Sequence, residues 1–330
     1  MCIRDSYNIE TKTQLDIIVV DNDNLDILMK QKFIKDDLDL HYNLSDILLT
    51  NKGDTYIISE KPSGLTQKKD PGFIIHFATP GKKKLESMKI EFNEKKNYYA
   101  KFVIDNLNNK ITAGGLYSNK NLIRANGYYF LSIPLDSKKD YTLSYNAFDE
   151  SFLKEYLGKK SVNKKTGLLD GKVQEIVLRR DGGILLIGEK VKRKNRQAPS
   201  ANHRTDVLFR ADYYFEELFL ISIHPNGKEH WKNIIHKRQF SYDDEAVFSS
   251  FYPVKTSNSL NILFNDEIKT QSTVSEFRLN GIGEYKRRAI LNTRDMEVKL
   301  RIKDALQISA NTIVIPSQFR NKLKLVKFEF

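Results

Sequence analysis

The sequence predicts an all-β protein made of repeated antiparallel hairpins. Apolar and polar residues alternate along most of the 330 residues, between turn signals rich in Gly, Asn, Asp and Pro. No segment keeps the 3.6-residue period of a helix over a dozen residues. Two kinds of hairpin alternate along the chain, so the sheets are expected to repeat as well.

The first kind of hairpin is a strand, a tight turn and a second strand rich in Ile and Leu. Its clearest copy reads EIVLRRDGGILLIGE, in which Asp-Gly-Gly marks the turn. Because this pattern recurs at intervals, it defines the start of a repeating unit. Its copies begin at Asp46, Lys101, Glu175, Phe251 and Ala305.

The second kind of hairpin follows each of the first four copies of the first kind and reads, for example, LFLISIHPNGKEHWKNIIHK. Its copies begin at Phe73, Tyr129, Leu218 and Val274, and a worn copy begins at Leu15. A large aromatic residue follows the turn in most copies, and we expect these rings to pack between neighbouring sheets. They are Tyr141, Trp231 and Tyr285.

One hairpin of each kind makes a four-stranded unit. The first strands begin near residues 47, 102, 176, 251 and 306, which indicates a core repeat of roughly 50 residues with insertions. This length is typical of a β-propeller blade, whereas a β-sandwich would not repeat in this way. We expect blades at about 15–33 (partial), 45–94, 98–148, 173–238, 247–292 and 302–330 (partial).

The elements DGGILLIGE and PNGKEHW look like blade hairpins, and from Leu15 to Phe330 the chain resembles β-propeller repeat proteins of the Kelch and WD40 type. The WD dipeptide and the Kelch double glycine do not occur in register. The resemblance therefore implies a propeller scaffold and no particular activity.

The two ends of the chain predict an incomplete ring. Residues 1–6, MCIRDS, lack the apolar core of a secretory signal and look like a non-native or disordered leader, which leaves 7–330 as a single propeller domain. The last unit has three strands, and a strand from the N-terminus commonly closes such a blade. We expect that strand upstream of Tyr7, a parent of at least six blades and, if the N-terminus is truncated, an extracytoplasmic compartment.

Composition narrows the classes of site. Cys2 is the only cysteine, which excludes an intrachain disulfide and a thiolate metal cluster. The longest apolar runs are far shorter than the ~20 residues that span a bilayer. We expect a monomer without a metal or cofactor, and the net charge of +12 favours an acidic partner.

The connections between strands sort by length, and every long one falls at the same end of the blades. Loops on rigid scaffolds carry function, so this end is the expected binding face for a protein or an acidic polymer, that is, a glycan or a nucleic acid. The connection at 190–213 is the longest and most basic, and with the preceding one it predicts a positive patch. The patch comprises Lys159, Lys160, Lys192, Arg193, Lys194, Arg196 and Arg204. The alternative interpretation is a solvated, disordered loop.

Other candidates are weaker. Asp243, Asp244 and Glu245 could serve acid–base chemistry or pair with neighbouring cations. His224 and His230 flank one turn but have no third ligand in the sequence. No catalytic residue is assigned. A non-enzymatic binding or scaffold module is the favoured function, and the alternative is a propeller hydrolase or lyase that acts on glycans or peptides at its central axis.

Overall fold

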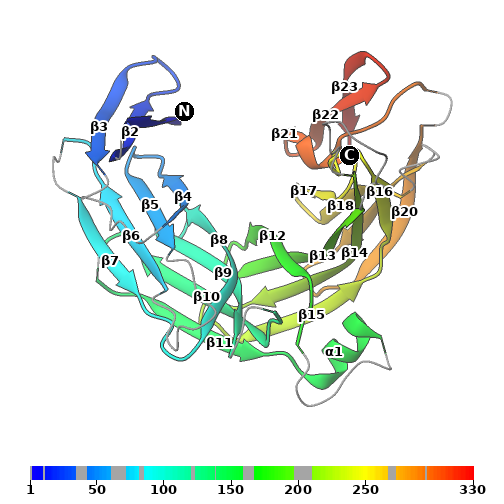
Figure 1. Cartoon of the computed structure of the whole chain (residues 1–330), viewed down its shortest axis with the longest axis horizontal. Helices are drawn as coiled ribbons and strands as arrows, with labels where there is room; N and C mark the ends of the chain where they lie inside the picture. The colour runs from blue at the N-terminus through cyan, green and yellow to red at the C-terminus, as the bar shows by residue number, and fades with distance from the viewer. Residues whose placement is uncertain are drawn as a thin grey trace, which may run out of the picture.

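The computed structural model describes residues 2–9, 12–34, 43–60, 72–81, 85–119, 123–137, 139–158, 167–196, 210–266, 273–293 and 296–330. These residues form six antiparallel sheets that follow one another along an arc (Figure 1). The predicted all-β fold class and its propeller arrangement of antiparallel blades are confirmed. The total number of blades in the parent stays a prediction.

The first three sheets contain eleven strands. The N-terminal sheet has the order β1-β2-β3, and the next two have the orders β4-β5-β6-β7 and β11-β10-β9-β8. Their bounds are β1 Cys2–Ile9, β2 Lys12–Val20, β3 Ile27–Ile34, β4 Asn43–Leu49, β5 Thr55–Glu60, β6 Phe73–Ala78, β7 Glu86–Ile90, β8 Lys96–Asp105, β9 Lys110–Ser118, β10 Gly127–Pro134 and β11 Thr142–Ala147.

The last three sheets have the orders β12-β13-β14-β15 with β16 added beside β14, β17-β18-β19-β20, and β21-β22-β23. Their bounds are β12 Gly171–Leu178, β13 Ile184–Arg196, β14 Arg210–Ile223, β15 Glu229–Ile235, β16 Gln239–Tyr242, β17 Phe251–Lys255, β18 Leu260–Asn265, β19 Thr273–Leu279, β20 Tyr285–Asn292, β21 Leu306–Ser309, β22 Thr312–Phe319 and β23 Lys322–Glu329. A 3-10 turn, η1 Ile302–Asp304, precedes β21.

The sheets stand radially, with their first strands on the inner side of the arc. Figure 1 shows β4, β8, β12 and β17 inside and β7, β11, β15 and β20 outside. Consistent with this, β8 contacts both β4 and β12. A hydrophobic cluster lies between each sheet and the next, so apolar strand faces on both sides of a blade are buried.

A side chain of β14 packs directly on the backbone of β13 in the sheet of β12–β15. Gly188 on β13 pairs with Phe219 on β14, and a Cβ atom added at Gly188 would lie 1.8 Å from Cζ of the Phe219 ring. The ring itself is fully buried in the cluster between this sheet and the preceding one. Glycine at this position is therefore required by space.

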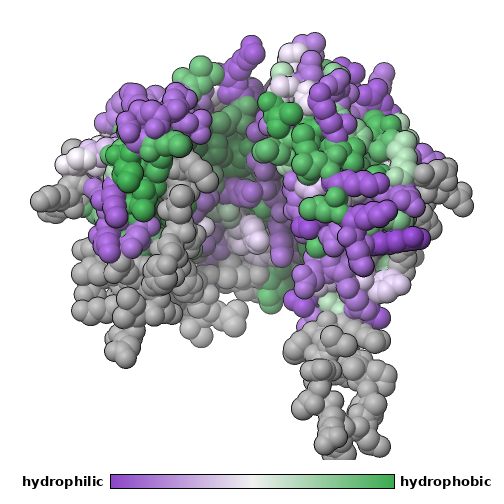
Figure 2. All heavy atoms as spheres, turned by 90° about the horizontal axis from the view of Figure 1, so that it is seen from above, coloured by the Kyte–Doolittle hydropathy of each residue, from purple (hydrophilic) through white to green (hydrophobic). Residues whose placement is uncertain are grey.

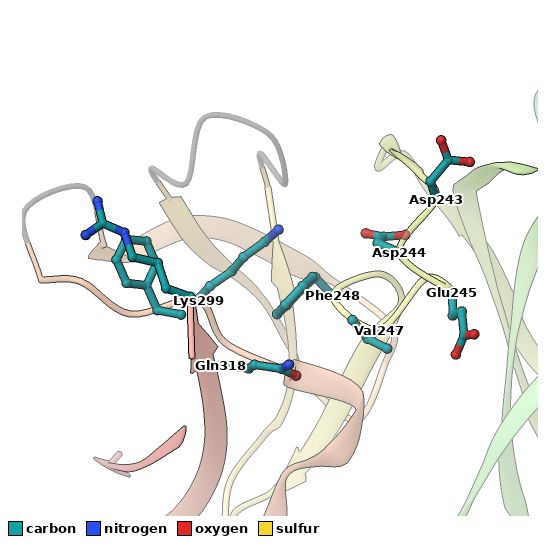
Figure 3. A pocket seen from close by; sticks show the side chains of 9 residues that line it. Asp243, Asp244, Glu245, Val247, Phe248, Lys299 and Gln318 are labelled. Atoms are coloured by element: carbon teal, nitrogen blue, oxygen red, sulfur yellow. The ribbon is translucent and has the colours of Figure 1, made fainter. Parts of the chain in front are cut away.

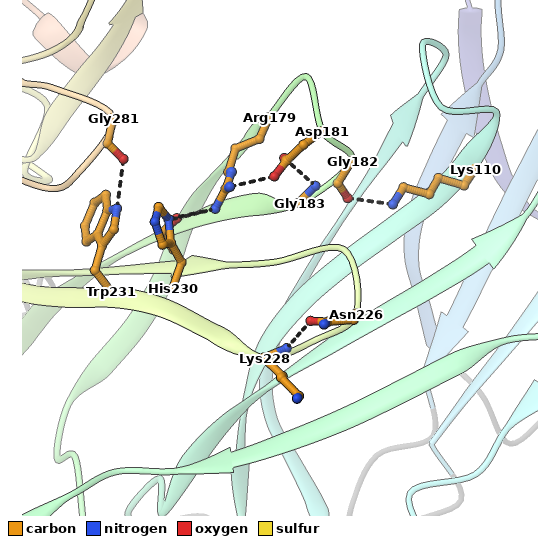
Figure 4. Close-up of polar contacts among 11 residues, drawn as sticks. Lys110, Arg179, Asp181, Gly182, Gly183, Asn226, Lys228, His230, Trp231 and Gly281 are labelled. Carbon is orange, nitrogen blue, oxygen red and sulfur yellow. Dashed lines mark hydrogen bonds and ion pairs between the residues drawn. The ribbon is translucent and has the colours of Figure 1, made fainter.

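The tight turns tie adjacent blades together (Figure 4). Lys110 on β9 donates to the carbonyl of Gly182 in the β12–β13 turn at 2.6 Å. Trp231 on β15 donates from Nε1 to the carbonyl of Gly281 in the β19–β20 turn at 3.0 Å. Trp231 thus contacts the neighbouring blade, as the aromatic positions after the turns predict.

Three features differ from the sequence-based expectation or were not anticipated. Residues 2–6 belong to β1, which pairs with β2, so the N-terminal sheet has three strands rather than two. Whether residues 1–6 are native to the chain stays a prediction. A short helix, α1 Glu150–Leu157, lies in the connection after β11. The connection expected at 190–213 begins and ends in strand, because β13 continues to Arg196 and β14 begins at Arg210; residues 197–209 lie outside the described residues.

Helix α1 is held by its N-cap residue, Asp149. The carboxylate of Asp149 accepts a hydrogen bond from the amide of Phe152 at 2.8 Å and pairs with Lys232 Nζ on β15 at 2.6 Å. Burial alone would raise the pKa of Asp149, but the hydrogen bonds from Lys232, Ser151 and the Phe152 amide hold that pKa well below its ordinary value. The cap therefore anchors the helix to the outer strand of the blade.

Apolar side chains also reach the surface at both ends of the arc (Figure 2). In the N-terminal sheet they lie around the β2–β3 turn, and in the C-terminal sheet they lie on β21 and β23. The exposed residues are Leu25, Ile27, Leu28, Leu306, Ile308, Leu323 and Leu325.

Candidate binding site

The basic connection expected at 190–213 contributes its two ends to a three-stranded ribbon. The pairing of β12 with β13 stops at Lys190, while residues 191–196 of β13 continue to pair with β14. On the other side of β14, residues 212–215 pair with β16 instead of β15. We call residues 191–196, 210–215 and 239–242 the basic ribbon. Residues 191–196 form a paired strand, which differs from the disordered loop of the alternative interpretation, and residues 193–196 of that strand are exposed.

The predicted patch is only partly described. Lys192, Arg193, Lys194 and Arg196 lie on β13 in the basic ribbon. Lys159, Lys160 and Arg204 lie outside the described residues. The structure therefore brings four of the seven predicted residues together on one strand.

Carboxylates hold two of these four cations. Lys192 Nζ lies 3.5 Å from Glu216 and 3.9 Å from Asp170. Arg196 contacts Asp212 at 3.0 Å and Asp243 at 2.7 Å. The local positive charge is consequently smaller than the sequence suggests, because carboxylates of β14 and of the segments before β12 and after β16 lie beside these cations.

Tyrosine rings accompany three of the cations. Arg193 lies 5.8 Å from the ring centroid of Tyr213, and Lys194 lies 5.3 Å from that of Tyr214. Arg196 lies 5.5 Å from the centroid of Tyr242, which is 49% exposed. These distances are within the range of cation–π contacts. The sequence did not show this, because the tyrosines sit on β14 and β16 and reach β13 only through strand pairing.

Three of the aromatic residues, Tyr214, Phe240 and Tyr242, share one face of the ribbon, and Tyr213 lies on the other. Lys192 pairs with Tyr214, which pairs with Phe240; Asp212 pairs with Tyr242 in the next row of that face. The rings of Tyr214 and Phe240 have centroids 5.0 Å apart. Cross-strand neighbours share a face of the sheet, so a row of rings runs across the ribbon.

A buried ion pair fixes the base of the ribbon. Glu189 and Lys237 are both fully buried, with Oε1 and Nζ 2.5 Å apart. Ser250 Oγ donates to the other carboxylate oxygen at 2.6 Å, and Lys237 donates to Gln239 at 2.8 Å. Burial lowers the pKa of Lys237, and the charge of Glu189 opposes that shift. The pair lies where β14 changes its partner from β15 to β16.

A cleft of about 820 Å³ adjoins the ribbon (Figure 3). One wall is the segment after β16, and the other is formed by the lead into η1 and the end of β22. Asp243 belongs to both features, because it lines the cleft and pairs with Arg196. The lining residues are Asp243, Asp244, Glu245, Val247, Phe248, Lys299, Gln318, Phe319 and Arg320.

The acidic segment of the cleft is held in an unusual backbone conformation. Asp243, Glu245 and Ala246 have φ angles of 53°, 53° and 58°. Asp243 accepts a hydrogen bond from the amide of Ala211 at 3.0 Å, and Asp244 accepts one from the amide of Ala246 at 2.9 Å. Because Asp243 is committed to Arg196 and Ala211, the three carboxylates do not act as one cluster. The sequence allowed these residues either acid–base chemistry or pairing with neighbouring cations. Asp243 pairs with a cation, Arg196.

The histidine pair faces a cation. The rings of His224 and His230 have centroids 4.6 Å apart, and Arg179 Nη1 lies 3.2 Å from Nδ1 of His230 (Figure 4). Desolvation and the charge of Arg179 lower the pKa of His230. The guanidinium occupies the place where a metal would bind Nδ1. Within the described ranges, no group of three His, Cys, Asp or Glu could hold a metal ion.

The inner strands carry a pair of opposite charges. Lys101 on β8 and Glu175 on β12 approach to 3.9 Å on the inner side of the arc.

No helix in the described part of the chain is long and apolar enough to cross a membrane.

Comparison with known proteins identifies no family. No family model matches the chain, and no curated protein matches it. Among solved structures, Pyrococcus horikoshii acylaminoacyl peptidase is similar over 88% of this chain with 11% identity and a TM-score of 0.32. The match covers 46% of the peptidase, so the chain spans less than half of its length.

Two further structures are similar at the same low level. YCF48 from Cyanidioschyzon merolae has 7% identity over 96% of this chain and 91% of its own, with a TM-score of 0.32. Trypanosoma rangeli sialidase in complex with sialic acid has 8% identity over 97% of this chain and 59% of its own, with a TM-score of 0.27.

Proposed function

We propose that this chain is a non-enzymatic binding module that holds an anionic polymer on its basic ribbon. The observation that carries the proposal is the pairing of cations with tyrosines: Arg193, Lys194 and Arg196 each lie within 6 Å of a tyrosine ring on a neighbouring strand. A polymer with both negative groups and planar groups uses both kinds of contact. Single-stranded nucleic acid has this chemistry, because its phosphates meet cations and its bases stack on aromatic rings.

The four cations divide into two roles. Lys192 and Arg196 are held by carboxylates, which keeps the outer part of β13 in place. Arg193 and Lys194 are exposed, and no ion pair involves either of them among the residues that the structure describes. We therefore assign the polymer contacts to Arg193 and Lys194, which lie on the two opposite faces of β13. A ligand that displaced the carboxylates from Arg196 would lose the energy of two ion pairs.

The proposal predicts a site-specific contribution beyond the bulk charge of the chain. Labelled single-stranded oligonucleotide and heparin are titrated at several salt concentrations by fluorescence anisotropy. The double variant Arg193→Ala/Lys194→Ala is expected to bind the oligonucleotide about tenfold or more weakly, and the salt slope falls by roughly 1.4 for the two lost contacts. Tyr242→Ala is expected to weaken binding of the oligonucleotide by about fivefold or more and to change binding of heparin little, because only the oligonucleotide has bases that stack on the ring.

The matched control removes two exposed positive charges elsewhere on the chain. Lys322 and Lys324 on β23 are exposed, and their double alanine variant has the same net charge as the ribbon variant. It is expected to bind as the unchanged chain does. Equal losses in both double variants would mean that net charge alone attracts the polymer, and the proposal would be wrong. Stronger binding of heparin than of the oligonucleotide would assign the ribbon to an acidic glycan.

A further inference from the structure

The cleft beside the ribbon has walls of opposite charge. Asp244 follows β16 on one wall, and Lys299 and Arg320 stand on the other, one before η1 and the other after β22. The backbone of Lys299 is fixed, because its amide donates to Ser317 Oγ at 3.0 Å and its carbonyl accepts from the amide of Gln318 at 2.9 Å. The cations are therefore held beside β22 of the last sheet, and the carboxylate lies in the connection between β16 and β17.

The two charges face each other across an apolar floor. Figure 3 shows the side chain of Asp244 directed toward Phe248 and the ammonium of Lys299 extending toward the same ring. Lys299 Nζ lies 3.9 Å from the ring centroid of Phe248. Within the described ranges neither Asp244 nor Lys299 takes part in an ion pair, so both charges remain available to a third group.

The neighbouring acidic residues do not compete for this role. Asp243 is held by Arg196 and by the amide of Ala211. Glu245 points away from Lys299 in Figure 3. Asp244 keeps one carboxylate oxygen on the amide of Ala246, which orients the group toward the cleft. The cleft thus contains one oriented anion, Asp244, opposite Lys299, and Arg320 also belongs to its lining.

The direction of the pKa shift of Lys299 agrees with this arrangement. Burial lowers the pKa of Lys299, and the charge of Asp244 partly opposes the shift across the cleft. A partly desolvated ammonium gains more from a bound carboxylate than a fully hydrated one, because water screens it less.

We propose that this cleft binds a zwitterionic amino acid with an apolar side chain. The ligand's ammonium donates to Asp244, its carboxylate lies against Lys299 and Arg320, and its side chain packs on Val247 and Phe248. Pockets of about 300–1,000 Å³ hold small ligands, so the 820 Å³ cleft has room for an amino acid and its water. This site is separate from the polymer contacts of Arg193 and Lys194.

The test uses the full chain and three related probes. L-leucine, N-acetyl-L-leucine and L-leucinamide are titrated by ligand-observed NMR. L-leucine is expected to bind with a Kd of about 1 mM or tighter, and each capped form about tenfold or more weakly, because each lacks one charge. In Asp244→Asn, L-leucine and N-acetyl-L-leucine are expected to bind equally. In Lys299→Met, the difference between L-leucine and L-leucinamide should shrink by several fold, with Arg320 keeping part of it.

Control variants lie on η1, outside the cleft lining. Asp304→Asn and Lys303→Met make the same chemical changes a few residues away and are expected to leave every Kd unchanged. The comparison of capped and free ligand on the unchanged chain does not depend on any variant folding. The proposal is overturned if no probe shows saturable binding, or if Asp244→Asn still prefers the free ammonium by tenfold.

Discussion

Replacing Lys237 by Met should destabilise the chain strongly, because it leaves the Glu189 carboxylate buried without its counter-charge. Both side chains are fully excluded from solvent, and their charged atoms lie 2.5 Å apart. Apart from this ammonium, no hydrogen-bond partner of Glu189 Oε1 occurs among the described residues. Ser250 and Gln174 donate hydrogen bonds to Oε2 of Glu189, but neither carries a charge.

The expected magnitude follows from the burial of the pair. Removing one partner of a buried ion pair costs about 3–5 kcal/mol. Unfolding entropy is about 2.1 cal/mol/K per residue, so for 330 residues a loss of about 4 kcal/mol lowers Tm by about 6 °C. Replacing both partners, as Glu189→Leu/Lys237→Met, removes both buried charges and should recover most of the loss.

Thermal and urea unfolding of the single and double variants measure this difference. The matched control is Lys154→Met, which breaks the exposed pair with Glu150 on α1 and should change stability by less than about 0.5 kcal/mol. A Lys237→Met chain as stable as the original would show that water reaches Glu189. A double variant as unstable as the single one would show that packing, and not the uncompensated charge, determines the loss.

Two further predictions concern the scaffold. Asp149→Ala should cost about 1 kcal/mol through the lost helix cap, measured by urea unfolding. Because the pKa of Asp149 in the folded chain lies below 3.8, its contribution is present above that pH and disappears as the pH falls below it, so the variant should show a flatter acid limb. Gly188→Ala should destabilise by about 1–3 kcal/mol through its clash with Phe219, whereas Gly281→Ala, with open space around it, should be neutral or better in thermal melts.

The repeat was predictable from the sequence because hairpins impose a local period. Residues 47, 102, 176, 251 and 306, where the first strands were expected, lie within β4, β8, β12, β17 and β21. Alternation with a period of two, interrupted by turn residues, needs no knowledge of distant contacts. The short helix α1 was missed for the same reason, since eight residues are too few to establish a helical period.

The cleft was not predictable from the sequence. Asp244 was visible as an acidic residue, but its opposing cations come from positions 299 and 320, more than 50 residues further along. Nothing in the local pattern around Lys299 marks it, because a lysine in a polar connection is usually solvated. Only the packing of the last sheet beside its neighbour brings these side chains to one place.

The basic ribbon shows why strand register matters for its function. A charged stretch with Ser, Asn and Pro resembles a disordered loop, and composition cannot tell which residues of β14 pair with β13. In the observed register Lys192 pairs with Tyr214 and Arg193 with Tyr213, so each face carries a cation beside a ring. A slip of one residue would move every side chain of one strand to the other face. Lys192 would then share its face with Tyr213 or Phe215. The row formed by Tyr214 and Phe240 would lie on the opposite face of the ribbon. The binding that we propose therefore depends on the pairing that Glu189 and Lys237 hold at the base of the ribbon.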